Sequence, residues 1–235
     1  MLTSVFDSIR KAIPPIHREG YPFIAAAFVA ALLLLLLWEP LGWIGFIITI
    51  YVAFFFRDPV RVVPADPNLV VSPADGIVTA VDLAAPPPEL GLGREKRVRI
   101  SVFLSIFNVH VNRVPVGGTV ARIAYRPGKF LNADLDKASE DNERNSLIVK
   151  TAAGQDIAVV QIAGLIARRI VCWAKEGDQI APGARFGLIR FGSRLDVYLP
   201  DGAVTFASVG QTAVGGETIL AQLSGGEARL AFRQD

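Results

Sequence analysis

The hydrophobic pattern divides the chain into two parts of different character. From Tyr21 to Phe56 nearly every residue is apolar, and the main interruption is Glu39-Pro40. One continuous helix of this length would measure about 54 Å, far more than the ~30 Å hydrocarbon core of a bilayer. Divided at Glu39-Pro40, the pattern predicts two helices of about 24–27 Å, Tyr21–Trp38 and Leu41–Phe56. We therefore expect a membrane-anchoring helical hairpin over residues 21–56.

The residues that flank this hairpin predict its orientation. Basic side chains stand on both sides of it, with Arg10, Lys11 and Arg18 before it and Arg57 and Arg61 after it. Lys and Arg close to membrane segments favour the cytoplasmic side. We therefore expect a protein of the cell (inner) membrane whose remaining domain lies on the cytoplasmic side.

Residues 1–20 form a separate N-terminal segment with an amphipathic pattern. Its apolar residues Val5, Phe6, Ile9 and Ile13 fall near one face of a helix, and Pro14-Pro15 ends the pattern. Such a helix fits a membrane surface, and a solvated terminal helix fits the same pattern.

Residues 57–235 carry short β-like runs separated by Gly, Pro and Asp, with little helical pattern. A helix is predicted only over Asn132–Ala138, and a turn near Ser105–Asn108. Regular short strands with frequent turns indicate a mainly β domain, a sandwich or barrel. The predicted strands are Gly76–Val81, Val98–Leu104, Gly118–Tyr125, Ser146–Thr151, Asp156–Ile162, Arg169–Trp173, Phe186–Phe191 and Leu195–Leu199.

Composition narrows the chemistry that the chain can carry. The net charge of +2 over 235 residues is too small to indicate a nucleic-acid partner. A single cysteine, Cys172, excludes an intrachain disulfide framework and a cysteine-rich zinc site, and we expect no metal. His17 and His110 are the only imidazoles, so a mechanism that needs histidine has almost no choice.

The stretch Phe186–Pro200 predicts a strand, a corner and a second strand, with Gly192-Ser193 at the corner. Glycine reaches backbone conformations closed to other residues and leaves its carbonyl open to approach. A serine held directly after it can turn its hydroxyl onto the Gly192 carbonyl carbon, which is the geometry of an N→O acyl shift. The ester formed can then be eliminated, and the resulting dehydroalanine hydrolyses to a pyruvoyl group. The alternative for Gly-Ser is an ordinary turn.

Two further residues complete a candidate catalytic set. His110 alternates with Val109 and Val111, and Asp75 precedes Gly76 in Ser72-Pro-Ala-Asp-Gly76. A base activates a serine hydroxyl, and a carboxylate orients the base and stabilises its cation. The alternatives are a structural histidine and an Asp-Gly turn.

Seven ordered stretches of this chain resemble the phosphatidylserine decarboxylase family in its shorter, membrane-anchored form. Together they cover most of residues 55–200, so they are far more specific than any single motif. The matching stretches are Phe55-Phe-Arg-Asp-Pro59, Ser72-Pro-Ala-Asp-Gly76, Phe103–His110, Tyr125–Asn132, Asp141-Asn-Glu-Arg-Asn145, Ala163–Arg169 and Arg190-Phe-Gly-Ser-Arg194.

The resemblance implies autocatalytic cleavage between Gly192 and Ser193. A large chain 1–192 and a small chain 193–235 would form a heterodimer, with room for a homodimer of these heterodimers. Ser193 would become a covalent pyruvoyl cofactor, with His110 as general acid or base and Asp75 orienting the base in maturation. Phosphatidylserine would form a Schiff base with the pyruvoyl ketone and leave as phosphatidylethanolamine. We expect neither a metal nor pyridoxal phosphate.

Two departures from the longer family members concern the histidine and the cleavage site. Those members have Leu-Gly-Ser-Thr or Leu-Gly-Ser-Ser at the cleavage site, where this chain has Phe191-Gly-Ser-Arg194. They also carry a second histidine, near whose position Arg113 stands here. His110 is therefore expected to serve both maturation and decarboxylation.

Several residues could bind the lipid headgroup, and other functions compete with the decarboxylase. Guanidinium groups match phosphate and carboxylate, so the candidates for headgroup binding are Arg57, Arg61, Arg113 and Arg194. The alternatives are an archaetidylserine-type decarboxylase, a pyridoxal enzyme using Lys129 or Lys137, and a non-catalytic membrane-tethered β-domain adaptor. The adaptor predicts an intact chain, and the decarboxylase predicts two chains.

Overall fold

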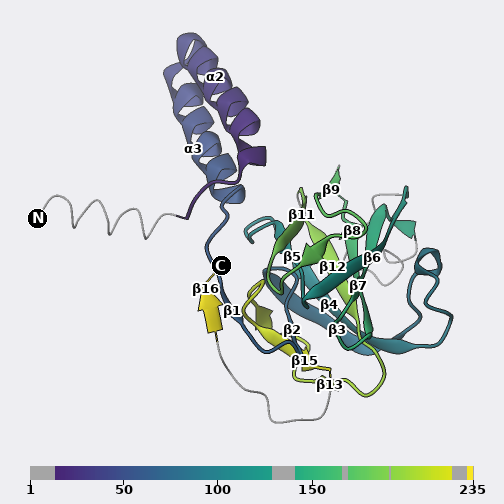
Figure 1. Ribbon diagram of the computed structural model, residues 1–235. Coiled ribbons are helices and arrows are strands. Elements are labelled where there is room, and N and C mark those ends of the chain that lie inside the picture. The colour runs from purple at the N-terminus through teal and green to yellow at the C-terminus, as the bar shows by residue number, and fades with distance from the viewer. Residues whose placement is uncertain (1–13, 129–140, 166–168, 191, 224–231, 235) are drawn as a thin grey trace, which may run out of the picture. The chain divides into compact units, whose positions relative to one another are not determined.

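The computed structural model describes residues 14–128, 141–165, 169–190, 192–223 and 232–234 (Figure 1). The chain divides into two compact units, one up to Val60 and one from Arg61 onward. The predicted helix Asn132–Ala138 and the first 13 residues of the N-terminal segment lie outside the described residues.

The first unit is a hairpin of two apolar helices. The short 3-10 helix η1 (Arg18–Gly20) leads into α2 (Tyr21–Leu37), and α3 (Glu39–Phe55) follows. Trp38 separates α2 from α3 with an extended backbone, φ −162° and ψ 122°. Pro40 follows within the first turn of α3, where its missing N–H leaves no hydrogen bond unmade. The predicted break at Glu39-Pro40 therefore lies one residue earlier.

Small residues allow the two helices to pack closely. A Cβ atom on Gly45 would lie 2.8 Å from the Cβ of Ala31, and one on Gly42 would lie 2.6 Å from the Cβ of Leu35. These contacts pair residues in opposite chain order, so the helices are antiparallel. The hydroxyl of Thr49 donates to the Gly45 carbonyl at 2.9 Å, which satisfies a polar group inside the pair.

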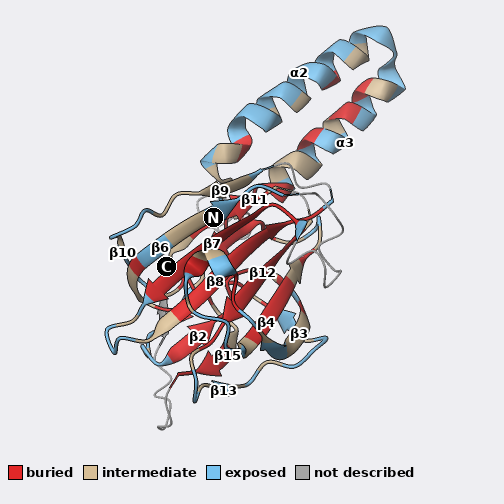
Figure 2. Ribbon diagram, turned by 90° about the vertical axis from the view of Figure 1, so that its right-hand side faces the viewer, coloured by how far each residue is buried: buried red, intermediate tan, exposed pale blue. Residues whose placement is uncertain are grey.

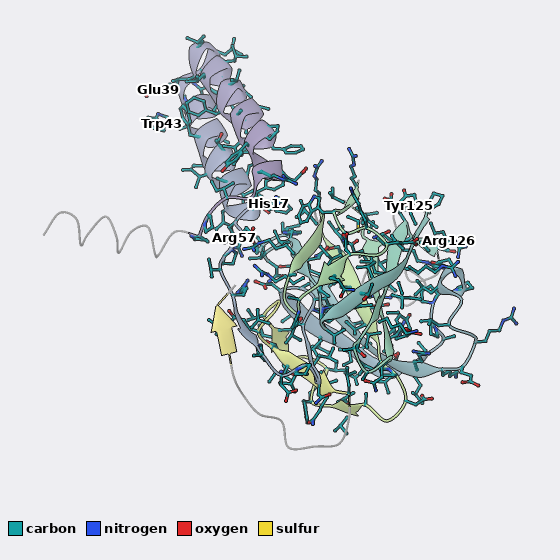
Figure 3. The ribbon with its side chains drawn as sticks, in the orientation of Figure 1. His17, Glu39, Trp43, Arg57, Tyr125 and Arg126 are labelled. Atoms are coloured by element: carbon teal, nitrogen blue, oxygen red, sulfur yellow. The ribbon has the colours of Figure 1, made fainter. Side chains whose placement is uncertain are left out.

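Backbone hydrogen bonds join the two ends of the hairpin. His17 N–H donates to the Phe56 carbonyl at 2.8 Å, and Asp58 N–H donates to the Pro15 carbonyl at 2.7 Å. His17 and Arg57 accordingly lie at the same end of the hairpin (Figure 3). The chain therefore enters and leaves this unit at one end, as an anchor inserted from one side requires.

The outer surface of the hairpin is apolar. Leu36 and Leu37 are 83% and 79% exposed, and Ile47 and Ile50 are almost as open. The span Arg18–Leu37 is long and apolar enough to cross a membrane, and α3 is shorter. A helix pair that is apolar all round fits a hydrocarbon environment.

Over its described residues, the second unit is an antiparallel β domain of four sheets. The largest sheet has eight strands in the order β10-β6-β7-β8-β12-β4-β3-β14, and the others are β5-β11-β9, β13-β15-β2 and β1-β16. The strands are β1 Val62–Pro64, β2 Leu69–Val71, β3 Gly76–Ala84, β4 Arg97–Leu104, β5 Val111–Arg113, β6 Gly118–Arg126, β7 Arg144–Lys150, β8 Asp156–Ala163, β9 Ile170–Cys172, β10 Gln179–Ile180, β11 Arg185–Ile189, β12 Ser193–Tyr198, β13 Val204–Thr205, β14 Thr212–Ala213, β15 Ile219–Gln222 and β16 Phe232–Gln234.

The main hydrophobic core covers one face of the eight-stranded sheet. Its members come from alternate positions of the large sheet, such as Leu195 and Val197, and from the smaller sheets, such as Phe186 and Leu220. A smaller cluster on the opposite face lies beside the 3-10 helix η2 (Pro88–Leu90). The strands β7, β8, β12 and β4 are therefore buried on both faces over most of their length (Figure 2).

The predicted fold class is confirmed, because the domain is mainly β and follows apolar helices. All eight predicted strands are present, with ends that differ by at most three residues. The turn at Ser105–Asn108 is also present, closed by a hydrogen bond from Asn108 N–H to the Ser105 carbonyl. The strands that the pattern did not predict have two to four residues, too few to show an alternation.

We predict that truncating a core side chain lowers the free energy of unfolding much more than truncating a surface side chain. Leu147→Ala in β7 removes a buried side chain and should lower the free energy of unfolding by about 2–5 kcal/mol. Leu83→Ala in β3 is the matched control, because Leu83 is 62% exposed and its loss should change stability by less than about 0.5 kcal/mol. Urea unfolding of the full chain in detergent measures both, and equal losses would contradict the assigned core.

Candidate active site

Six of the seven stretches singled out in the sequence meet at one end of the eight-stranded sheet; Phe55–Pro59 belongs to the first unit. Six strands share one row of paired residues, which in spatial order holds Arg126, Arg144, Ile162, Arg194, Phe103 and Ile77. At or one residue beyond this row, β6, β8 and β4 end and β7, β12 and β3 begin. We call this edge the Ser193 end of the sheet. Segments far apart in the sequence are thus neighbours there.

Ser193 is the first residue of β12 and pairs with Leu104 on β4 and Ala163 on β8. Its side chain points to the core face, as do Leu195 and Val197, and it is fully buried. Within the described part of the chain, Ser193 Oγ has no hydrogen-bond partner. An unpaired buried hydroxyl costs free energy, so the position calls for an explanation other than stability.

Gly192 allows the chain to change sheets just before Ser193. β11 belongs to the three-stranded sheet and β12 to the eight-stranded sheet, so only residues 190–192 connect the two. Gly192 has φ +54°, in the left-handed region that favours glycine, and a Cβ there would meet nothing within 4 Å. The backbone conformation, rather than crowding, therefore selects glycine at this position. Phe191 lies outside the described residues.

His110 lies in a second connection between the same two sheets. β4 pairs with β12 in the large sheet, and β5 pairs with β11 in the small one. The segment that joins β4 to β5 therefore runs between the same sheets as the segment that joins β11 to β12. His110 is fully buried at its end, directly before β5, whose Val111 pairs with Leu188. The fold thus brings the His110 and Ser193 connections to one end of the domain.

Local hydrogen bonds shape the start of the His110 connection. Asn108 Oδ1 accepts from both the backbone N–H and the hydroxyl of Ser105, each at 2.8 Å. This side-chain acceptor closes the turn directly after β4. The chain can then reverse toward β5 within a few residues.

Asp75 lies at the same sheet end, just before β3, and its carboxylate has two partners. Arg61 Nη2 donates to both carboxylate oxygens at 2.8 and 2.6 Å, and Gly215 N–H donates to Oδ1 at 2.8 Å. These bonds fix the carboxylate and neutralise its charge. The role of Asp75 in orienting His110 stays a prediction.

The four arginines proposed for the lipid headgroup all bond to protein groups. Arg57, in the first unit, donates to the Phe54 carbonyl at 2.9 Å and stacks on its ring, and Arg61 holds Asp75. Arg113 is buried and donates to the Gly183 carbonyl at 3.0 Å. Arg194 is buried on the sheet face opposite Ser193, where Asp196 binds it. Headgroup binding by any of them stays a prediction.

A pocket of about 640 Å³ lies on this opposite face, beside the Pro86–Pro88 segment. Two of its lining arginines are paired, Arg99 with Asp82 and Arg144 with Glu89. Burial, with a further contribution from Asp196, raises the pKa of Tyr198 above its ordinary value. The paired charges indicate a structural surface rather than an anion site.

The sequence interpretation missed a set of buried amides close to this end of the sheet. Asn112, Asn145 and Gln161 are all buried and bonded to one another. A signal existed for Gln161, because it is a polar residue inside the apolar run Ile157–Ala163. Asn112 and Asn145 gave no such signal, since each stands among other polar residues.

The fold and the gathered segments define a mainly β enzyme domain joined to an apolar helical hairpin. A profile of the phosphatidylserine decarboxylase family matches residues 48–221. The chain is also 58% identical over 223 residues to the phosphatidylserine decarboxylase proenzyme of Cereibacter sphaeroides (strain ATCC 17025 / ATH 2.4.3). That alignment covers 95% of this chain and 96% of the relative. This chain therefore belongs to the phosphatidylserine decarboxylase family.

The Glu89–Arg144 pair generates a pH-dependent prediction. Burial alone would raise the pKa of Glu89, but hydrogen bonds from Arg144 and its positive charge outweigh burial and lower it. A carboxyl group whose pKa is lower in the folded than in the unfolded protein stabilises the fold at pH values above its unfolded pKa. This stabilisation is lost as the pH falls through the folded pKa. Glu89→Gln should therefore destabilise the protein at neutral pH, and the difference from the parent should shrink below about pH 4.

Thermal unfolding of the full chain between pH 3 and pH 8 measures this difference. Glu95→Gln, at an exposed position of the following segment, is the control and should leave the pH profile unchanged. A difference between Glu89→Gln and the parent that is independent of pH would contradict the assigned charge pairing.

Proposed function

We propose that this chain is the precursor of a phosphatidylserine decarboxylase that cleaves itself between Gly192 and Ser193 and so makes its own pyruvoyl group. The observation that carries the proposal is the buried Ser193 hydroxyl, unpaired within the described residues and placed directly after a glycine at φ +54°. A serine hydroxyl can reach the carbonyl carbon of the preceding residue through a five-membered ring. Gly192 and Ser193 therefore fit the formation of a pyruvoyl group from Ser193.

The cleavage begins with attack by the serine oxygen. Ser193 Oγ adds to the Gly192 carbonyl carbon while a base takes the hydroxyl proton and delivers it to the leaving amide nitrogen. The peptide bond breaks, and an ester now joins the Gly192 carboxyl group to Ser193 Oγ. Removal of the Ser193 α-proton then expels the Gly192 carboxylate, which becomes the end of the large chain. The dehydroalanine at position 193 tautomerises, takes up one water and releases ammonia, leaving a ketone.

His110 is the base that we assign to the first step. It is fully buried, and it lies in the connection that joins the same two sheets as the Gly192-Ser193 corner. A neutral imidazole can accept the hydroxyl proton of a serine. In the mature enzyme the same imidazole would return a proton to the substrate carbon after carbon dioxide leaves. Asp75, which lies just before β3, would orient this base during maturation.

The substrate that we assign is phosphatidylserine, and the product is phosphatidylethanolamine. The relative from Cereibacter sphaeroides carries phosphatidylserine decarboxylase in its name, and the apolar hairpin would keep this chain at a bilayer where such a lipid resides. The pyruvoyl group supplies a ketone that takes the substrate amine and withdraws the electrons left by decarboxylation. The flanking basic residues favour a catalytic domain on the cytoplasmic side of the cell (inner) membrane.

The two chains produced by cleavage would stay together. The small chain 193–235 would begin with β12, which pairs with β4 and β8 of the large chain over its whole length. The heterodimer is thus the expected state of the mature enzyme.

Replacement of the nucleophile should leave the precursor intact. We predict that Ser193→Ala gives one chain of 235 residues, whereas the parent gives fragments 1–192 and 193–235, the latter with a ketone trapped by borohydride. Ser101→Ala is the matched control, because Ser101 Oγ is also buried and unpaired within the described residues but faces the opposite side of the sheet. Intact mass spectrometry reads both, and persistent cleavage of Ser193→Ala would disprove the assignment.

Replacement of the base should slow the cleavage without preventing folding. Loss of a general base costs about 10²-fold or more, so His110→Ala should accumulate precursor and show little release of carbon dioxide from phosphatidylserine. His17→Ala removes the other imidazole, in the first unit, and should cleave at the parent rate. If His110→Ala were processed and active at the parent rate, His110 would have neither role.

A further inference from the structure

Three buried side-chain amides form a continuous chain of hydrogen bonds that ends at His110. Asn145 Nδ2 donates to Gln161 Oε1 at 2.8 Å, and Gln161 Nε2 donates to Asn112 Oδ1 at 2.7 Å. Asn112 Nδ2 then donates to the His110 carbonyl at 3.2 Å. Gln161 and Asn112 each accept through the side-chain oxygen and donate through the side-chain nitrogen, so the chain has one direction, from β7 through β8 to β5.

The amide chain joins the two sheets that carry the candidate catalytic residues. Asn145 and Gln161 lie on the eight-stranded sheet in one row with Leu195, two residues from Ser193 on the same face. Asn112 lies on the three-stranded sheet, two residues from His110. The chain of amides therefore bridges from the strand neighbours of Ser193 to the backbone of His110.

Gly187 on β11 makes this bridge sterically feasible. It is the register partner of Asn112, and a Cβ there would lie 2.7 Å from Gln161 Nε2 and 2.4 Å from the Val171 carbonyl oxygen. The three-stranded sheet thus passes directly over the Gln161 amide. Only a residue without a side chain fits there.

Stability alone does not account for three amides in a hydrophobic core. A buried amide must recover through hydrogen bonds what it loses in hydration, and the net gain is small. Apolar side chains of similar volume would fill the same space without that requirement. What the amides add is direction, because a fully satisfied network admits one arrangement of the groups that it joins.

We propose that Asn145, Gln161 and Asn112 are positioning residues that fix the His110 backbone, and through it the imidazole, relative to Ser193. The inference rests on the proposed self-cleavage. Through the final hydrogen bond to the His110 carbonyl, the amides of β7 and β8 fix the position of the segment that carries His110. A displaced carbonyl would move the imidazole and slow the proton transfer in cleavage, while the fold itself persists.

Asn112→Asp tests the last bond of the chain. An aspartate at 112 still accepts from Gln161, but its carboxylate form has no donor for the His110 carbonyl. We expect self-cleavage at pH 8 to slow about tenfold, which corresponds to one lost hydrogen bond in the transition state. The protonated acid regains the donor, so the ratio of variant rate to parent rate should rise as the pH falls. The nearby titratable groups, His110, Arg113 and Cys172, are present in both proteins, but the carboxylate at 112 also favours the charged form of the His110 imidazole. Gln161→Glu, one amide farther from His110, controls for this added charge.

Two further variants separate positioning from stability. Val149→Ala truncates the same core on β7, farther from the Ser193 end, and should lower the melting temperature without slowing cleavage. Gln161→Glu accepts from Asn145 but cannot donate to Asn112 as a carboxylate, and should show the same pH-dependent ratio. It decides the question if Asn112→Asp fails to fold. The time course of cleavage is followed by denaturing mass spectrometry after cell-free synthesis of the full chain into nanodiscs.

The outcomes distinguish this inference from the proposed function. A parent chain that never cleaves would disprove both. A parent that cleaves, with Asn112→Asp and Gln161→Glu cleaving at the parent rate at every pH, would overturn the positioning role alone. A slowing that is independent of pH and matched by Val149→Ala at equal loss of melting temperature would reduce the amides to core packing, and would also overturn it.

Discussion

The strand β12 is hydrogen-bonded on both sides along its entire length, and the placement of the site depends on this constraint. From Ser193 to Tyr198 every residue is paired with β4 on one side and with β8 on the other. A serine on a free loop would sample many orientations, whereas Ser193 has its backbone fixed by two neighbours. The proposed cut falls directly before the first paired residue, so neither ladder loses a pair. The new chain end would therefore keep the position that the precursor gave it.

Charges on the opposite face of the sheet reinforce this strand. Asp196 is fully buried between Arg194, with Nε 2.9 Å from Oδ1, and Arg99, with Nη1 4.0 Å from Oδ2. An isolated buried carboxylate would be very unfavourable, so these guanidinium groups are needed to balance it. Burial tends to lower the pKa of Arg99, but Asp82 and Asp196 outweigh burial and raise it. Because Arg99 belongs to β4 and Asp196 to β12, the pairing spans the two chains that cleavage would produce.

The elements that could be predicted from sequence are those with a local pattern. The apolar run with Glu39-Pro40 predicted the two helices. Short β-like runs between turn residues predicted eight strands, of which all but β9 have five residues or more. Most short strands could not be predicted. β5, for example, has three residues, and both faces of Val109–Arg113 are buried. The motifs singled out candidate site residues, but not how these residues are arranged in space. The pairing of Asp75 with Arg61 and the amide chain through Gln161 depend on strand register, which no local pattern encodes.

The burial of Ser193 and His110 suits the order of steps in the proposed cleavage. An ester between Gly192 and Ser193 would hydrolyse to an ordinary serine if water reached it before elimination, and no ketone would form. Both residues are fully buried in the precursor, which excludes bulk water from this ester. Water is needed only after elimination, when the chain is already broken at Gly192. The break frees the corner between β11 and β12. On this mechanism the elimination therefore also opens the path by which water reaches position 193 to complete the ketone, and by which the lipid amine reaches the ketone later.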